Sequence, residues 1–391
     1  MQNILSIIVL CSVSYLTACD SSSETTVVTS NEEIDLRQLL KVPEHFAIPP
    51  IPDFNVPTRE KIELGRRLFY DTKLSANQTQ SCASCHKQSL AFSDGKVTPK
   101  GSTGEQLVRN SQGLANSAYH PTLTWANKVF LEIEDQLQVP IRADDPVELG
   151  VTPIYVDEVL ARFNNDNVYI GLFANAFPES STGATLNKII QALATFCRTL
   201  ISGDSPYDRY YQGDKTALTQ QQLLGFQLFN GEKFECFHCH GGINFSTSYR
   251  DNNSNLGTQT YPFFNNGLYN LNGDGSYPTD DQGLFDQTFN PNHRGFFRPP
   301  SLRNVALTAP YMHDGSIATL REVIDHYLRG GRLIENGPNA GDGRLNPLKS
   351  GLVRGFSASE EEIAAVIAFL ESLTDENFVN NPDFSNPFSE K

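Results

Sequence analysis

Apolar side chains recur at helical spacing in several stretches of the chain. Residues 186–200 show this most clearly, because an apolar residue follows at every third or fourth position. A spacing near 3.6 residues predicts an amphipathic helix that buries one face. Residues 59–70 and the stretch after Thr319 also read as helices, so the chain is predicted to be mainly α-helical. The apolar positions of the first stretch are Leu186, Ile189, Ile190, Leu193, Phe196, Cys197 and Leu200.

Helix ends are marked in the second half of the chain. At three places a hydroxyl residue is followed three positions later by Glu or Gln, which is the pattern of a capping box at a helix start. Gly330 and Gly331 predict the end of the middle helix, since glycine readily closes a helix. The three pairs are Thr219 and Gln222, Thr319 and Glu322, and Ser359 and Glu362.

Two stretches of the first half recur in the second half. The pattern Leu-Gly-x-x-Leu-Phe occurs at residues 64–69 and again at 224–229, and residues 113–119 parallel residues 301–307. Such a repeat predicts two related domains. The predicted segments are 1–18 as a signal peptide, 19–57 as a lipidated tether and proline-rich stretch, 58–212 and 213–375 as the two domains, and 376–391 as a polar tail.

The first residues predict export. A short apolar run ends at Leu-Thr-Ala-Cys, the form of a lipoprotein cleavage box, so Cys19 is predicted to be the lipidated N-terminus. The alternatives are an ordinary cleaved signal or a buried helix, and residues 1–3 supply no Lys or Arg. The net charge of −15 argues against a nucleic-acid partner and is compatible with an extracytoplasmic protein or a basic redox partner.

Two Cys-x-x-Cys-His motifs begin at Cys82 and Cys236. Two thiols followed at once by an imidazole predict the covalent attachment of a c-type haem and an axial ligand for its iron. A zinc half-site or a dithiol redox pair would leave the adjacent histidine of both motifs unexplained. Cys197 remains as a buried thiol without a disulfide partner. The predicted haem residues are Cys82, Cys85 and His86 in one motif and Cys236, Cys239 and His240 in the other.

Over residues 58–375 the chain resembles the bacterial di-haem cytochrome c peroxidase and MauG superfamily. The resemblance implies two tandem cytochrome c-like helical domains, each with one covalently attached haem c. Residues 121–127 and 145–150 look most like the MbnH-type branch, whose relatives modify tryptophan on a partner protein. The other matching stretches are Phe92-Ser93-Asp94-Gly95, Val108-Arg109-Asn110-Ser111, residues 131–150, residues 300–315 and residues 319–323.

In that superfamily the N-terminal haem reacts with hydrogen peroxide. The resemblance implies that Glu148 carries the proton and that Gln136 orients the peroxide, although their spacing is two residues longer than in the ordinary peroxidase pattern. Alternatively, Glu148 caps a loop and Gln136 lies on the surface. No histidine occurs from residue 87 to 119, so the first iron is expected to be five-coordinate at rest. His120 is the nearest residue that could contradict this.

The second haem is expected to have a different axial ligand. Peroxidases of this superfamily use a Met fourteen residues after the histidine that matches His313, and that position is Tyr327 here. The resemblance therefore implies tyrosinate ligation as in MauG. Two alternatives remain: Tyr327 belongs to the apolar face of its helix, or Met312 is the ligand.

Trp125 and a calcium ion complete the implied site. Extending the second repeat by six residues places Trp125 opposite His313, and the family position lies between the haems, where an indole can relay charge. Trp125 is the only tryptophan, so no second tryptophan can serve as a surface station. The resemblance implies calcium ligands at Asn110, Thr308 and Pro310.

The expected function is a di-haem c enzyme that uses hydrogen peroxide to reach a high-valent state shared by both haems. It is expected to oxidise a periplasmic partner protein, at a tryptophan, while anchored through Cys19. Alternatives are a cytochrome c peroxidase that takes electrons from a small cytochrome, and an electron-transfer cytochrome without chemistry of its own. Residues 242–291 lack a helical period and are expected to form a long loop over the second haem or against a partner.

Overall fold

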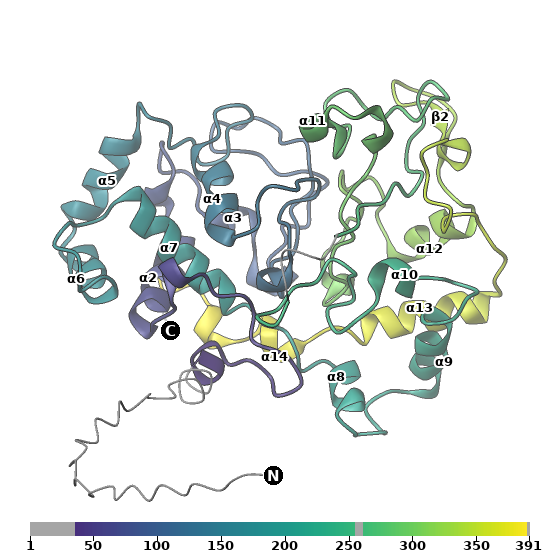
Figure 1. The fold of residues 1–391 in the computed structure, drawn as a ribbon, viewed down its shortest axis with the longest axis horizontal. Coiled ribbons are helices and arrows are strands. Elements are labelled where there is room, and N and C mark those ends of the chain that lie inside the picture. Colours follow the sequence, from purple (N-terminus) through teal and green to yellow (C-terminus); the bar gives the residue numbers. More distant parts are fainter. Residues whose placement is uncertain (1–35, 255–260, 389–391) are drawn as a thin grey trace, which may run out of the picture.

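The computed structural model describes residues 36–254 and 261–388, so the predicted signal peptide and Cys19 lie outside the described residues. Two helical lobes lie side by side (Figure 1). The first lobe contains α2 (Arg59–Tyr70), α3 (Cys82–Cys85), α4 (Ile133–Arg142), α5 (Val156–Asn164), α6 (Asn167–Ala176) and α7 (Leu186–Arg198). The second contains α8 (Pro206–Tyr211), α9 (Gln220–Phe229), α10 (Phe237–His240), α11 (Phe285–Thr288), α12 (Leu320–Leu328) and α13 (Glu360–Glu371). A two-residue antiparallel pair, β1 (Leu333–Ile334) with β2 (Gly341–Asp342), and α14 (Glu376–Val379) complete the fold.

The predicted helix ends are confirmed. The three capping boxes form at the starts of α9, α12 and α13, where each N-cap hydroxyl accepts a hydrogen bond from the backbone three residues on. After α12, the amides of Gly330 and Gly331 donate to the carbonyls of Tyr327 and His326, and both glycines have positive φ. The mainly α-helical prediction is therefore correct.

The repeated Leu-Gly pattern is explained by two close helix crossings. A Cβ built on Gly65 of α2 would lie 2.0 Å from the carbonyl oxygen of Ala192 in α7. A Cβ on Gly225 of α9 would lie 1.9 Å from the carbonyl oxygen of Ala365 in α13. Only glycine permits this approach, so each lobe has its own pair of crossed helices.

The second repeat also has a common structure. Asn116 and Asn304 both adopt a left-handed backbone conformation, and a short 3-10 helix follows each. Their side chains meet at Ser202, because Nδ2 of Asn116 donates to the Ser202 carbonyl and Nδ2 of Asn304 donates to the Ser202 hydroxyl. The two repeats therefore pack around one another where the lobes join.

The C-terminal segment differs from the polar tail expected at 376–391. Its α14 and the 3-10 turn that follows run back to the first lobe (Figure 1). Phe378, Val379 and Phe384 are buried in the core of that lobe, and Phe92 lies with its ring centroid 5.7 Å from that of Phe378. Isolated aromatic residues among polar ones give no periodic signal, which is why the sequence did not reveal this contact.

The 242–291 insertion is largely irregular, as expected, and contains α11. Its apolar residues form a core of their own against Ala126 and Trp125, and the predicted burial of Cys197 in α7 is confirmed. Within the described residues, no helix combines the length and apolar character needed to cross a membrane. The buried insertion residues of this core are Phe263, Leu268, Tyr269, Tyr277 and Leu284.

Candidate functional site

The first motif forms a short helix that ends at His86. Nδ1 of His86 donates a hydrogen bond of 2.7 Å to the carbonyl of Phe92, because Ala91 and Phe92 turn the chain through two positive φ angles. Burial lowers the pKa of His86 and keeps its ring neutral. A neutral imidazole that donates from Nδ1 leaves Nε2 available as a metal ligand.

Glu148 lies beside this motif. Burial raises the pKa of both Cys82 and Cys85, and the nearby Glu148 charge adds to the rise at each thiol. Burial raises the pKa of Glu148 itself to about 7. A carboxyl group with that pKa exchanges protons readily at neutral pH, which is the property that a general acid-base residue needs.

Backbone contacts hold the Glu148 loop in place. The amide of Ser102 donates to the Glu148 carbonyl at 2.8 Å, and a Cβ on Gly101 would lie 1.6 Å from the carbonyl oxygen of Val147. The segment 101–105 is therefore packed against this loop. Gln136 is half-buried on α4, the helix that precedes the loop.

The second motif opens into a cavity of about 240 Å³ that both lobes line. Nδ1 of His240 lies 3.2 Å from the carbonyls of Phe245 and Pro300, so Nε2 is again free to ligate a metal. Burial lowers the pKa of His240 to about 4, and the ring is neutral at pH 7. Cys236 and Cys239 lie in the same cavity wall.

Tyr327 and Met312, the two candidate ligands of the second iron, both line this cavity. Burial raises the pKa of the Tyr327 phenol, and the two thiols of the second motif raise it further, so the phenol lies near them. Asn266 of the insertion donates to the Met312 sulfur at 3.3 Å and lies close enough to the Tyr327 phenol to oppose the rise of its pKa. The insertion therefore reaches the second site, and Asn266 is a site residue that the aperiodic sequence did not reveal.

Trp125 and the three proposed calcium ligands line the same cavity. Nε1 of Trp125 donates to the Asn110 carbonyl at 2.9 Å. Nδ2 of Asn110 donates to the carbonyls of residues 96 and 97, so its Oδ1 lies on the other side of the amide, as a cation ligand requires. Thr308 and Pro310 complete this part of the wall, and the structure thus brings together the residues assigned to charge relay and calcium.

His120 lines the cavity of the second motif. It is buried in the cavity wall, and its Nδ1 is 3.0 Å from both the Ser248 carbonyl and Nη1 of Arg298. Burial and the Arg298 charge hold the pKa of His120 well below its usual value. This placement supports the expectation that His120 is not a ligand of the first iron.

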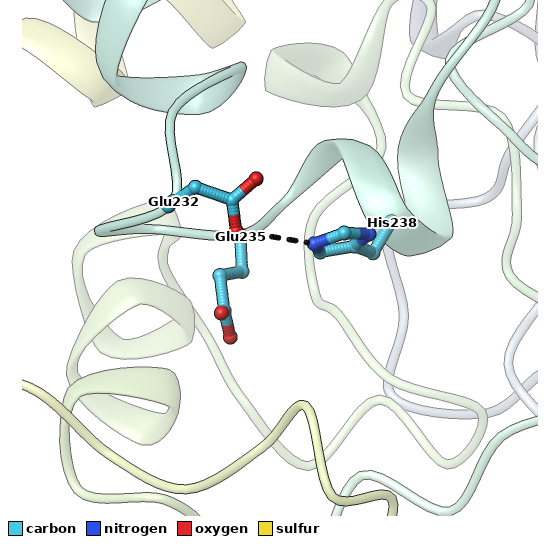
Figure 2. A group of neighbouring side chains, drawn as sticks. All are labelled: Glu232, Glu235 and His238. Atoms are coloured by element: carbon cyan, nitrogen blue, oxygen red, sulfur yellow. Dashed lines mark ion pairs between the residues drawn. The ribbon is translucent and has the colours of Figure 1, made fainter.

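Glu232, Glu235 and His238 form a cluster next to the second motif, with possible ligand atoms within 4.8 Å of one another. Figure 2 shows Glu232 facing His238, whose Nε2 is 3.6 Å from the carboxylate. Glu235 is already paired with Arg354, and Glu232 is exposed. A cation would have to displace the arginine, so no metal is assigned to this cluster.

The two motifs fit covalently attached haem. In each, two cysteine thiols and a neutral histidine with a free Nε2 lie in one short helical turn. The histidine is oriented through Nδ1 by backbone carbonyls, which is how metal-binding imidazoles are held. A zinc ion needs at least three ligand atoms close together, and among the described residues the cysteines and terminal histidine of neither motif form such a group with a further His, Cys, Asp or Glu.

Comparisons with known proteins agree with this chemistry. A family profile described as "Di-haem cytochrome c peroxidase" matches residues 59–216. Cytochrome-c peroxidase IdrP1 of Pseudomonas sp. (strain SCT) is 36% identical over 341 residues, which cover 83% of each chain. Methylamine utilization protein MauG of Methylorubrum extorquens is 33% identical over 368 residues, covering 93% of this chain and 92% of the relative.

A solved structure gives the same result. The crystal structure of a MauG-like protein associated with microbial copper homeostasis matches with a TM-score of 0.87 and 46% identity. The match covers 89% of this chain and 99% of that chain. The chain therefore belongs to the di-haem cytochrome c peroxidase and MauG family of haem-dependent oxidoreductases.

Proposed function

We propose that this protein uses hydrogen peroxide at the His86 haem to oxidise a tryptophan residue of a periplasmic partner protein. The observation that carries the proposal is the asymmetry of the two sites. Glu148, a carboxyl group with a pKa of about 7, lies at the first motif, whereas a tyrosine lines the second cavity. The MbnH-type residues 121–127 and the similarity to a MauG-like protein support a protein substrate.

Proton transfer is the task of the protein at the first site. The Glu148 carboxylate takes a proton from HOOH and returns it to the oxygen that leaves as water. The Gln136 side-chain amide orients the peroxide through a hydrogen bond. When bound, the haems supply the redox chemistry and hold the two oxidising equivalents. Reduction of one peroxide to two waters consumes two electrons and two protons, which the oxidised partner residue supplies.

The second site and the cavity between the lobes complete the proposed path of charge between the two haems. Tyr327 would hold the second iron, and Asn266, which favours the deprotonated phenol, would position its side chain. Trp125 relays charge between the haems from its position in the wall of the shared cavity. Asn110, Thr308 and Pro310 bind a calcium ion that fixes the two lobes relative to each other.

Cellular location belongs to the same proposal. Residues 1–18 direct export, and a lipid on Cys19 anchors the protein at a membrane surface. Haem attachment and the partner protein then share one extracytoplasmic compartment.

The decisive experiment adds one equivalent of peroxide to the fully oxidised protein and records optical and Mössbauer spectra. We expect the spectra of both irons to change in the wild type. In Tyr327→Phe only the first iron should respond, whereas Met312→Leu should behave as the wild type. Two six-coordinate irons whose spectra do not change on addition of peroxide would disprove the proposal.

Catalytic reduction of peroxide with a small cytochrome is the second candidate function. It is favoured by the relatives named as cytochrome c peroxidases, at identities similar to those of MauG. The two functions are separated by steady-state assays with reduced cytochrome c. Fast turnover that survives in Tyr327→Phe would replace the partner-oxidation proposal by this one.

A further inference from the structure

Arg298 is a buried cation without a carboxylate partner among the described residues. Its side chain is 2% exposed and lines the cavity beside the second motif. Four other buried or half-buried arginines each pair with an acidic side chain. Those pairs are Arg198 with Glu134, Arg303 with Asp208, Arg250 with Glu132, and Arg109 with Asp281.

The hydrogen bonds of Arg298 all go to neutral groups. Nε donates to the Thr124 carbonyl at 3.1 Å, and Nη2 donates to Oε1 of Gln112 at 2.6 Å. Nη1 lies 3.0 Å from Nδ1 of His120 and 3.4 Å from the carbonyl of Pro299. These contacts use at most four of the five guanidinium N–H groups, so the second N–H of Nη2 keeps unused donor capacity.

The charge nevertheless persists at neutral pH. Burial lowers the pKa of Arg298 only to about 9. An isolated charge in an apolar interior is strongly unfavourable, and an anion that enters the cavity removes that penalty. The side chain is thus preorganised for a carboxylate, with the planar donors that carboxylates prefer.

We propose that Arg298 binds a propionate carboxylate of the second haem. The haem held by Cys236, Cys239 and His240 occupies the cavity that Arg298 lines, and its propionates are the carboxylates that this cofactor brings. The inference rests on the presence of the second haem and is independent of the partner protein and of Tyr327 ligation.

Arg298 also positions the Trp125 loop. Its backbone amide donates to the Trp125 carbonyl at 2.8 Å, while its side chain holds the carbonyl of Thr124. The residue that binds the propionate therefore also fixes the backbone carbonyls of Thr124 and Trp125. The bound propionate neutralises the Arg298 guanidinium. The positive charge that would disfavour a positively charged Trp125 indole is thereby removed.

The test measures the reduction potential of each haem in holoprotein carrying Arg298→Gln, Arg298→Lys or Arg344→Gln. Arg298→Gln should lower the reduction potential of the second haem by at least about 59 mV, because a cation near the iron is lost. This change shifts the equilibrium between ferric and ferrous iron tenfold toward the ferric form. The first haem should change less, and Arg298→Lys should retain most of the wild-type value. Arg344→Gln, which removes an exposed arginine of the same lobe, should have no effect.

Unchanged potentials in Arg298→Gln protein that contains two haems would overturn the proposal. A crystal structure of the wild-type holoprotein decides the question even if that variant does not assemble. A carboxylate oxygen of the second haem within about 3.2 Å of the guanidinium supports the assignment. Water, a small anion, or a carboxylate of the first haem in that place refutes it.

Discussion

At the residue scale, burial shifts the pKa of the haem-site histidines and that of the Glu148 carboxyl group in opposite directions. It lowers the pKa of His86 and His240, which keeps both imidazoles neutral and able to ligate iron. It raises the pKa of Glu148 to about 7, which keeps a proton within reach of the reaction. The same desolvation therefore prepares ligands at two positions and a proton carrier at a third.

Glu148→Gln should slow the reaction with peroxide by roughly 10²- to 10⁴-fold, since the amide cannot accept the proton of HOOH. In the wild type the rate constant should rise with pH through about 7, because only the deprotonated carboxylate acts as the base. The variant should lose this rise. Stopped-flow absorbance at a series of pH values measures both effects.

The control for this experiment is Glu158→Gln, which removes an exposed carboxylate on α5. It should leave the rate and its pH profile unchanged. A Glu148→Gln enzyme that keeps the wild-type profile would assign the proton transfer to another group.

At the scale of elements, each lobe is organised by one crossing of two helices. The crossing explains why Leu-Gly recurs in the sequence, and capping residues fix where α9, α12 and α13 begin. The helix starts could be predicted because capping depends on neighbours within a few positions in the chain, whereas the crossings bring together residues 65 and 192 and residues 225 and 365, far apart in sequence. The contacts of Asn266 and Arg298 could not be predicted either, because each depends on segments far apart in sequence.

Gly65→Ala and Gly225→Ala should each lower the free energy of unfolding by about 1–3 kcal/mol or more, since the new methyl group meets a backbone carbonyl of the crossing helix. Gly171→Ala on α6, where no atom lies within 4 Å of the built Cβ, is the matched control. It should change stability by less than about 1 kcal/mol. Denaturant unfolding measures all three, and equal behaviour of the three variants would refute close crossing.

Asn266→Ala should perturb the second haem without loss of haem. With Tyr327 as the proposed phenolate ligand, loss of Asn266 would let the phenolate donate more strongly to ferric iron, so the reduction potential of the second haem should fall by about 59 mV, a tenfold shift of the ferric–ferrous equilibrium. Spectroelectrochemistry and resonance Raman spectra of the holoprotein report the change. Asn272→Ala, at an exposed position of the same insertion, should leave both readouts unaltered.

At the scale of the whole molecule, the lobes are joined by buried polar contacts as well as by the shared cavity. Asp375 accepts hydrogen bonds from the amides of Gly203 and Asp204, and its own amide donates to Asn304. Asp375 lies between α13 and α14, and after it the chain enters the core of the first lobe. The C-terminal segment thus connects the end of the second lobe to the helices that carry the first haem motif.

Replacing Phe378 or Phe384 by alanine should therefore destabilise the first lobe, although both residues lie at the other end of the chain. Each ring is buried against Phe92, and loss of a buried phenylalanine costs about 3–5 kcal/mol. Phe388→Ala, at a position that is 44% exposed, should cost much less. Thermal unfolding followed at the absorbance of each haem distinguishes the lobes. The two rings support Phe92, whose carbonyl orients His86. Variants that kept the wild-type spectrum and stability would show that the rings are not needed for this support.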